Sequence, residues 1–160
     1  MTTQLTSAQV CQALEKEIFA VVGMVNANQE ARTVGIMYTV RDRKLYFSTA
    51  TSAWKTRYIT ANAHVSVTVP IAKRIPVMPW IKIPAATITF AGTARVFPAT
   101  EVTPDLLRAI LGPLADDLHA REETSIVEVT PTGDFITYGV GVSLRDMRLP
   151  ELARGRAAVA

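Results

Sequence analysis

Leu45–Val69 reads LYFSTATSAWKTRYITANAHVSVTV and indicates more about the fold than any other stretch of the chain. Lys44–Thr49 is rich in aromatic and hydroxyl-bearing residues, which favour a β-strand. Ser52 is a typical N-cap residue, so we predict a short helix over residues 53–60. His64–Val69 then alternates polar residues with valines, which predicts a second strand with one buried face.

The turn between the first strand and the helix has the chemistry of an anion site. The first amides of a helix lack intrahelical acceptors, and the helix dipole favours a negative charge beside them. Lys55 lies in the first helical turn and can bring its ammonium to the same place, while Ser48, Thr49, Thr51 and Ser52 add hydroxyl donors. These groups suit a phosphate, although no glycine-rich nucleotide loop is present. The alternative is a capped surface helix with a solvated lysine, and the spacing alone does not separate the two.

Segments on both sides of this stretch extend the pattern. Residues 26–31 predict a hairpin, residues 33–38 (TVGIMY) predict a strand, and residues 86–97 (ATITFAGTARVF) contain the pattern G-x-A-x-V. In this order, over residues 10–140, the chain resembles the pyridoxamine 5'-phosphate oxidase-like family of FMN-binding split β-barrels. The resemblance implies a mainly β fold with flanking helices (α+β), built on a six-stranded antiparallel split β-barrel.

The resemblance also implies which residues hold the cofactor. They lie on the predicted strands and on the short helix, and they are Arg32, Thr33, Gly35, Ser48, Thr49 and Lys55. Lys55 and the two hydroxyl residues would meet the phosphate and the ribityl chain, and residues 32–35 would face the flavin ring and the phosphate. A slip of one residue would exchange Arg32 for Thr33 as the contacting side chain, so this alternative stays open. Trp54 stands where relatives often have an arginine, which removes one cation from the predicted site.

The function that the resemblance implies is that of an FMN-dependent oxidoreductase acting on a small molecule. Relatives are commonly homodimers with the flavin between subunits, so we expect a homodimer with the cofactor at the interface. Residues 139–150 read GVGVSLRDMRLP and lack the Arg-x-His element of true pyridoxamine phosphate oxidases. We therefore do not expect pyridoxamine phosphate to be the substrate. Hydride transfer is the chemistry of the flavin itself, so no catalytic residue is predicted.

Two alternatives stay open on the same fold. A deazaflavin-dependent reductase would use Arg57, Lys73 or Arg74 to meet the longer anionic tail of its cofactor. A non-catalytic flavin- or haem-binding module would need no acid or base at all. We rank haem behind the flavins, since His64 and His119 lie far apart in the sequence. No cysteine lies near either histidine, and Asp116 and Asp117 precede His119 on a helix face that we expect to be exposed, so we predict no metal site.

The charge pattern does not favour nucleic acid. The chain has a net charge of +3, with 17 basic and 14 acidic residues interspersed. One local basic and aromatic stretch, residues 71–84 (IAKRIPVMPWIKIP), contains three prolines that exclude a central strand or a long helix. We predict a loop there that covers a barrel mouth or meets a second subunit, and no nucleic-acid partner.

Membrane and secretion signals are also missing from the sequence. The longest apolar run, residues 18–25, has eight residues and is too short to cross a bilayer. The first twelve residues contain no lysine or arginine. We therefore expect a cytoplasmic protein without a membrane partner. Cys11 is expected to be a buried helix residue.

The rest of the chain is predicted as helices and strands around the barrel. Thr6 or Ser7 would cap a helix over residues 8–19, and Thr103 would cap another that breaks at residues 112–113 before a further helical segment over 114–120. Gly92 predicts a bulge or bend. Strands over residues 125–130 and 135–140 would form a last hairpin. We expect one flavin-binding domain over residues 1–145 and a mobile C-terminal tail over residues 146–160.

Overall fold

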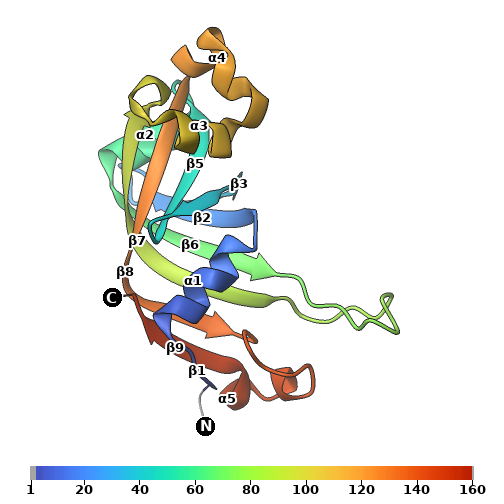
Figure 1. Ribbon diagram of the computed structural model, residues 1–160. Helices are drawn as coiled ribbons and strands as arrows, with labels where there is room; N and C mark the ends of the chain where they lie inside the picture. The colour runs from blue at the N-terminus through green and yellow to red at the C-terminus, as the bar shows by residue number, and fades with distance from the viewer. Residues whose placement is uncertain (1–2, 160) are drawn as a thin grey trace.

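The structure is a computed structural model, and it describes residues 3–159 of the 160-residue chain. Its centre is one strongly curled sheet, with helices at both ends and one helix lying across it (Figure 1). The strands are β1 (Thr3–Gln4), β2 (Phe19–Val25), β3 (Ala31–Met37), β4 (Thr39–Arg41), β5 (Lys44–Ala50), β6 (His64–Ile71), β7 (Ala86–Pro98), β8 (Thr124–Tyr138) and β9 (Arg154–Ala158). The α-helices are α1 (Ser7–Glu15), α2 (Trp54–Ala61), α3 (Pro104–Leu111), α4 (Leu118–Glu122) and α5 (Pro150–Ala153). Three 3-10 turns are η1 (Ala99–Glu101), η2 (Gly112–Asp116) and η3 (Asp146–Arg148).

The sheet follows the order β1-β9-β8-β7-β6-β2-β3, and the β4–β5 hairpin joins it through β5, which pairs with β8. All pairs are antiparallel except β1 with β9. The predicted class, mainly antiparallel β with flanking helices, is confirmed. The predicted count of six strands is wrong, because nine strands form within the described residues. The additional strands include short ones such as β1 and β4, which lack the alternating pattern that marks a strand in the sequence.

Strand β8 is one continuous strand where the sequence predicted a hairpin. Residues 131–134 were expected to form a hairpin turn, but β8 continues through them as a single strand. Thr89 of β7 pairs with Ile136 of β8, whereas Ala91 pairs with Thr132, so β8 carries extra residues at this point. Gly133 has φ = 70°, which glycine adopts without steric cost. The turn-forming residues therefore make a bulge that bends β8.

The bend allows β8 to pair with β5 along its first half and with β9 along its last residues. Its first half pairs with β5, from Thr124 opposite Ala50 to Val129 opposite Leu45. Its last residues pair with β9 instead, from Asp134 to Tyr138. Strand β7 accompanies β8 on the other side along both halves. On this side of β8 the sheet therefore divides into two parts, one continued by β5 and the other by β9.

The main core fills the inside of the curled sheet. The valines of β6, Val65, Val67 and Val69, are buried, which confirms the alternation seen in the sequence. Helix α1 lies across the sheet (Figure 1) and contributes Val10, Cys11 and Leu14 to this core. Thr6 caps α1 in a capping box with Gln9, as predicted. The helix ends at Glu15, earlier than expected, since Phe19 already begins β2.

A second, smaller core lies between the sheet and the helices at the upper end of Figure 1. Leu107 of α3, Ala99 and Ala115 meet Tyr46 and Ile126 there. Pro104 opens α3 as predicted, and the helix ends before Gly112. The next helical segment was expected over residues 114–120, but a 3-10 turn occupies residues 112–116 and α4 begins only at Leu118.

The predicted C-terminal tail is folded in its described part. Residues 154–158 form β9, which pairs with β8 on one side and β1 on the other. Ala153 and Ala157 are buried, so the small side chains that suggested mobility instead allow close packing. Ala160 lies outside the described residues.

The proline-containing segment between β6 and β7 is a loop, as predicted. Residues 72–85 project away from the body of the protein (Figure 1). Trp80 on this loop is 74% exposed. No helix within residues 3–159 combines the length and apolar character that crossing a membrane would need.

Candidate functional site

The predicted strand-turn-helix is present between β5 and α2. The Ala53 amide donates to the Ala50 carbonyl (3.0 Å), and the Thr51 amide donates to the carbonyl of Glu123 (2.9 Å). The N-cap of α2 is Ala53, with no side-chain hydrogen bond. The prediction that Ser52 caps the helix is wrong, because the tight turn from Ala50 to Ala53 places the first helical residue one position later.

The helix N-terminus keeps several unpaired donors. The backbone amides of Ser52, Trp54 and Lys55 donate to no acceptor within residues 3–159. Lys55 is half-buried and forms no ion pair with any described residue. Helix α2 has no acidic residue in its first turn. A cation and free amides at the start of a helix are the groups that bind a phosphate, so this donor set fits one.

The threonine hydroxyls of the turn are used internally. Thr56 donates its hydroxyl to the Ala50 carbonyl (2.9 Å), and the hydroxyl oxygens of Thr56 and Thr49 lie 3.3 Å apart. The hydroxyls of Thr51 and Ser125 lie 2.9 Å apart. Thr49 is only 5% exposed. These bonds hold β5, α2 and β8 in place around the turn, so the contribution of Thr49 is to fix its geometry.

Ser48 and Thr49 lie on opposite faces of β5. Successive side chains of a strand alternate between its two faces. Phe47 and Thr49 are buried, with Phe47 in the main core, whereas Tyr46 belongs to the second core under α3. Ser48 therefore shares the face of Tyr46. The two hydroxyls do not converge on one point, and the role of each toward a cofactor stays a prediction.

The other three predicted residues lie on β3, at the edge of the sheet. Arg32 pairs with Met24 and Thr33 with Gly23, so their side chains point to opposite faces. A Cβ on Gly35 would lie 2.9 Å from the ring of Phe19, which covers this glycine. Within the described part of the chain, no hydrogen bond or ion pair links Arg32 or Thr33 to β5 or α2. Ser48, Thr49 and Lys55 thus belong to one strand-turn-helix unit, although the hydroxyls of Ser48 and Thr49 lie on opposite faces of β5, and the β3 residues lie on a separate strand.

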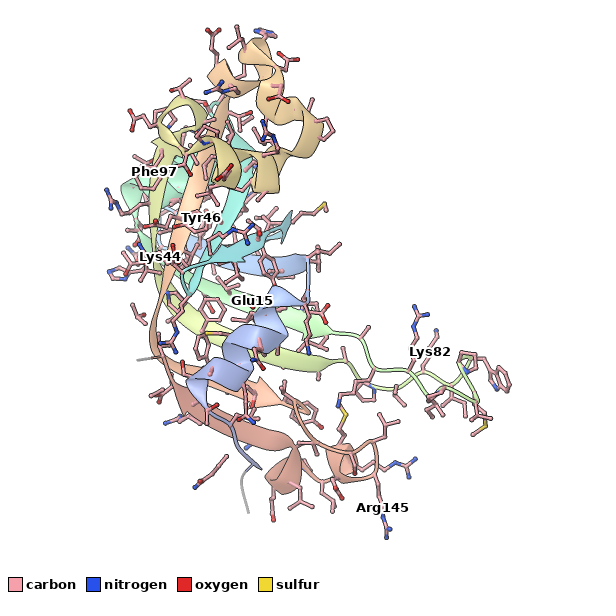
Figure 2. All side chains as sticks on the ribbon, in the orientation of Figure 1. Glu15, Lys44, Tyr46, Lys82, Phe97 and Arg145 are labelled. Atoms are coloured by element: carbon pink, nitrogen blue, oxygen red, sulfur yellow. The ribbon has the colours of Figure 1, made fainter. Side chains whose placement is uncertain are left out.

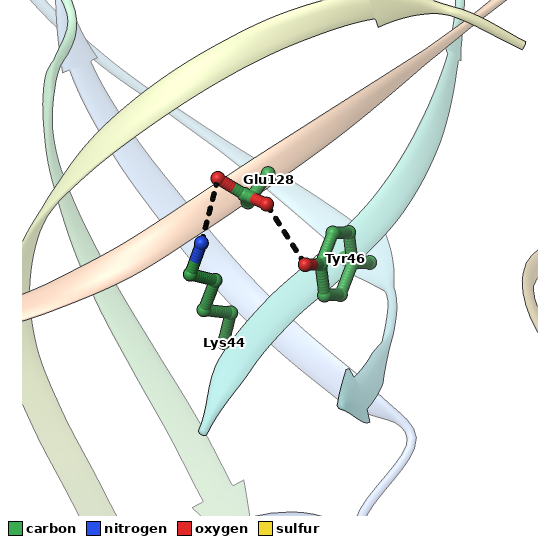
Figure 3. A network of polar contacts seen from close by, with 3 residues as sticks. All are labelled: Lys44, Tyr46 and Glu128. Atoms are coloured by element: carbon green, nitrogen blue, oxygen red, sulfur yellow. Dashed lines mark hydrogen bonds and ion pairs between the residues drawn. The ribbon is translucent and has the colours of Figure 1, made fainter. Parts of the chain in front are cut away.

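Lys44, Tyr46 and Glu128 form a partly buried polar network that the sequence did not predict. Glu128 of β8 accepts a hydrogen bond from the Tyr46 hydroxyl (2.8 Å) and lies 3.2 Å from the Lys44 ammonium (Figure 3). Tyr46 and Glu128 are directly opposite each other on β5 and β8. They are far apart in the sequence, so only the strand register reveals the pair. Burial, followed by the hydrogen bond to Glu128, raises the pKa of Tyr46 to about 12.

The raised pKa of Tyr46 predicts a pH dependence of stability. Between pH 10 and about 12 the folded protein keeps this proton while the unfolded chain loses it, so the free energy of unfolding falls as pH rises through this range. Tyr46→Phe should make the decline shallower, and it should cost about 1.5 to 3 kcal/mol at pH 8, because Glu128 loses a donor. Guanidinium unfolding at pH 8, 10 and 11 measures both effects. If the free energy of unfolding fell equally with pH in the wild type and in Tyr46→Phe, Tyr46 would not be the group whose raised pKa causes the decline.

Comparison with known proteins gives relatives only at the level of structure. No protein-family model matches the chain, and no curated protein matches it. An F420 reductase superposes with a TM-score of 0.56 and 21% identity, over 78% of this chain and 93% of the other. A putative pyridoxamine 5'-phosphate oxidase from Listeria innocua superposes with a TM-score of 0.56 and 16% identity, over 78% of this chain and 92% of the other. The haem storage protein HutZ from Vibrio cholerae superposes with a TM-score of 0.60 and 10% identity, over 84% of this chain and 96% of the other.

These identities are all below 25%, so what they establish is the fold. The similarity covers most of this chain and nearly all of each neighbour. The names of the neighbours include an F420 reductase, a putative pyridoxamine 5'-phosphate oxidase and a haem storage protein, so the architecture alone does not select one cofactor. The chain therefore has the split-barrel fold of the pyridoxamine 5'-phosphate oxidase-like proteins.

Proposed function

We propose that the chain binds FMN, with its phosphate at the N-terminus of α2, and acts as a flavin-dependent oxidoreductase on a small molecule. The observation that carries the proposal is the set of unpaired donors at Ser52, Trp54 and Lys55. These donors lie in a fold that the chain shares with a putative pyridoxamine 5'-phosphate oxidase. The missing Arg-x-His element argues against pyridoxamine phosphate as the substrate.

The residues of the chain would have separate tasks at this site. The amides of Ser52, Trp54 and Lys55 would donate to phosphate oxygens, and the Lys55 ammonium would balance their charge. The bonds from Thr56 to Ala50 and Thr49 would keep the turn in the required shape. Bound flavin supplies the hydride-transfer chemistry, while the protein fixes its position. Strand β3 is proposed to meet the ring with the backbone near Gly35 and with the side chain of either Arg32 or Thr33, since these two point to opposite faces.

We propose that a homodimer completes the pocket. Strand β3 is an edge of the sheet in one chain, and among residues 3–159 it pairs only with β2. Large apolar side chains are exposed on β3 and on its neighbour β2, including Met37 of β3 (70%) and Phe19 of β2 (46%). An open edge beside exposed apolar residues is a surface that a second copy can cover. Sedimentation velocity at micromolar concentration tests this, and a Met37→Glu variant that stays dimeric would exclude β3 from the interface.

The cofactor itself is the first point to test. The F420 reductase among the structural neighbours favours deazaflavin as the second candidate, and HutZ favours haem as the third. The visible spectrum of the purified protein separates flavin from haem, and a colourless protein is then titrated with FMN and with deazaflavin. Saturable FMN binding supports the proposal, and binding of deazaflavin alone replaces it. Oxidation of NAD(P)H by the loaded protein separates an enzyme from a passive module.

Lys55→Ala tests the phosphate site. We expect the dissociation constant for FMN to rise roughly 30-fold, since losing one charge-assisted hydrogen bond costs about 2 kcal/mol. Quenching of FMN fluorescence by flavin-free protein measures it. Riboflavin, which lacks the phosphate, should bind the variant and the wild type equally.

Lys82→Ala is the matched control for this titration. Lys82 lies on the projecting loop, away from α2 (Figure 2), so its removal should leave FMN affinity within twofold of the wild type. An equal loss of affinity in both lysine variants would indicate a general charge effect. Unchanged FMN binding in Lys55→Ala would remove this lysine from the site.

A further inference from the structure

A cavity of about 600 Å³ lies at the base of the projecting loop, at the opposite end of the molecule from α3 and α4 (Figure 1). One wall comes from the loop, and the other comes from the end of β8 and the segment that follows it. The lining residues are Ile75, Ile83, Pro84, Tyr138, Leu144, Arg145, Met147 and Arg148. None of the six residues predicted to hold a flavin is among them. The volume falls within the range of natural small-molecule sites.

Hydrogen bonds hold the second wall in place. The Tyr138 hydroxyl donates to the Met147 carbonyl (2.7 Å), and the Met147 amide donates to the Ser143 carbonyl (3.0 Å). Lys73, at the start of the loop, donates to the carbonyl of Val142 (3.0 Å) and so ties the two walls together. The cavity is therefore formed before any ligand arrives, which lowers the entropic cost of binding.

The lining combines an apolar body with unpaired positive charge. Most of the lining side chains are apolar, and the exposed residues Arg145 and Arg148 form no ion pair with any residue that the structure describes. The lining includes no carboxylate. Asp146, between the two arginines in sequence, already accepts a hydrogen bond from the Ser143 hydroxyl (2.7 Å). Figure 2 shows Arg145 on the lower segment, below the loop that carries Lys82.

We propose that this cavity binds a small molecule with an apolar body and one anionic head group. The aliphatic lining would take the body out of water, and the guanidinium groups of Arg145 and Arg148 would pair with the head group. A neutral molecule of the same shape would fill the cavity but leave both arginines unpaired. A small, fully hydrated anion would leave the apolar lining uncovered. This site is distinct from α2 within one chain and does not depend on the proposed flavin.

Octanoate and 1-octanol are the probes that test the proposal, since they share a chain and differ in the charged head. Isothermal titration calorimetry of the full-length protein should show saturable octanoate binding. The double variant Arg145→Ala/Arg148→Ala should weaken octanoate binding at least tenfold and leave 1-octanol binding within twofold. The matched control is Arg41→Ala/Arg95→Ala, which removes two exposed arginines outside the cavity lining and should leave both affinities unchanged.

Leu144→Trp provides a second test, because a larger ring in the cavity should abolish binding of both octanoate and 1-octanol. Retained binding of 1-octanol by the arginine variant shows that the site is still folded. The proposal is overturned when the wild type shows no saturable octanoate binding. It is equally overturned when the arginine variant and the control variant lose the same affinity, or when Leu144→Trp binds octanoate as the wild type does.

Discussion

Replacement of Phe90 by alanine is expected to lower the free energy of unfolding by about 3 to 5 kcal/mol. Phe90 is 1% exposed and lies opposite Val67 in the main core. Its ring meets the ring of Phe135 edge-on, with centroids 5.4 Å apart. Removal of the ring takes away buried apolar area, one aromatic pair and the filling of the space between β7 and β8. Guanidinium unfolding at a fixed protein concentration measures the change.

Phe97→Ala is the control on the same strand. Phe97 is only half-buried, and the guanidinium of Arg95 lies 4.9 Å from its ring centroid. Since solvent already reaches this ring, its loss should cost about 1 kcal/mol. A similar cost for both variants would mean that the Phe90–Phe135 contact contributes little beyond ordinary strand packing.

Local patterns predicted the parts of the fold whose partners lie nearby in the sequence. The alternating valines of β6 face the core, Thr6 caps α1, and the three prolines within residues 72–85 keep that segment out of the sheet. Each of these outcomes follows from side-chain period, capping chemistry or the missing amide of proline. None of them requires knowledge of a distant strand.

The errors arose where distant pairing overrides local preference. Residues 131–134 contain a proline and a glycine that favour a turn, but β7 runs alongside them and converts the turn into a bulge. The alanine-rich C-terminus has little strand propensity of its own, and it becomes β9 because β8 and β1 supply hydrogen-bond partners on both sides. A sequence pattern contains neither partner.

The features of the candidate site also differ in whether local sequence or distant contacts determine them. Lys55 and the start of α2 could be found from the sequence, since a helix N-terminus and its basic residue are local features. The separation of Ser48 and Thr49 onto two faces also follows from strand alternation. The pairing of Glu128 with Tyr46, and the cavity between the projecting loop and Arg145, depend on contacts between distant segments. Only the folded chain reveals them.

Gly92→Ala should cost about 3 kcal/mol of folding free energy, the upper end of the range for extra atoms in a packed region. Gly92 lies where β7 passes between Val65 of β6 and Pro131 of β8. A Cβ at this position would lie 2.6 Å from Cγ1 of Val129 and 3.0 Å from the carbonyl oxygen of Thr130. The second contact is with backbone, so a side-chain rotation cannot relieve the clash. Strands β7 and β8 would have to separate beside the bulge that bends the sheet.

Gly23→Ala is the matched control, because its Cβ would meet its nearest neighbours at 3.7 Å, an ordinary contact. Its free energy of unfolding should stay within about 0.5 kcal/mol of the wild type or rise slightly, since alanine restricts the unfolded chain. Val129→Ala removes Cγ1, so the double variant with Gly92→Ala should lose less stability than the sum of the two single changes. Strict additivity would show that Val129 is not what excludes a side chain at Gly92, and a harmless Gly92→Ala would show that β7 and β8 can separate there at little cost.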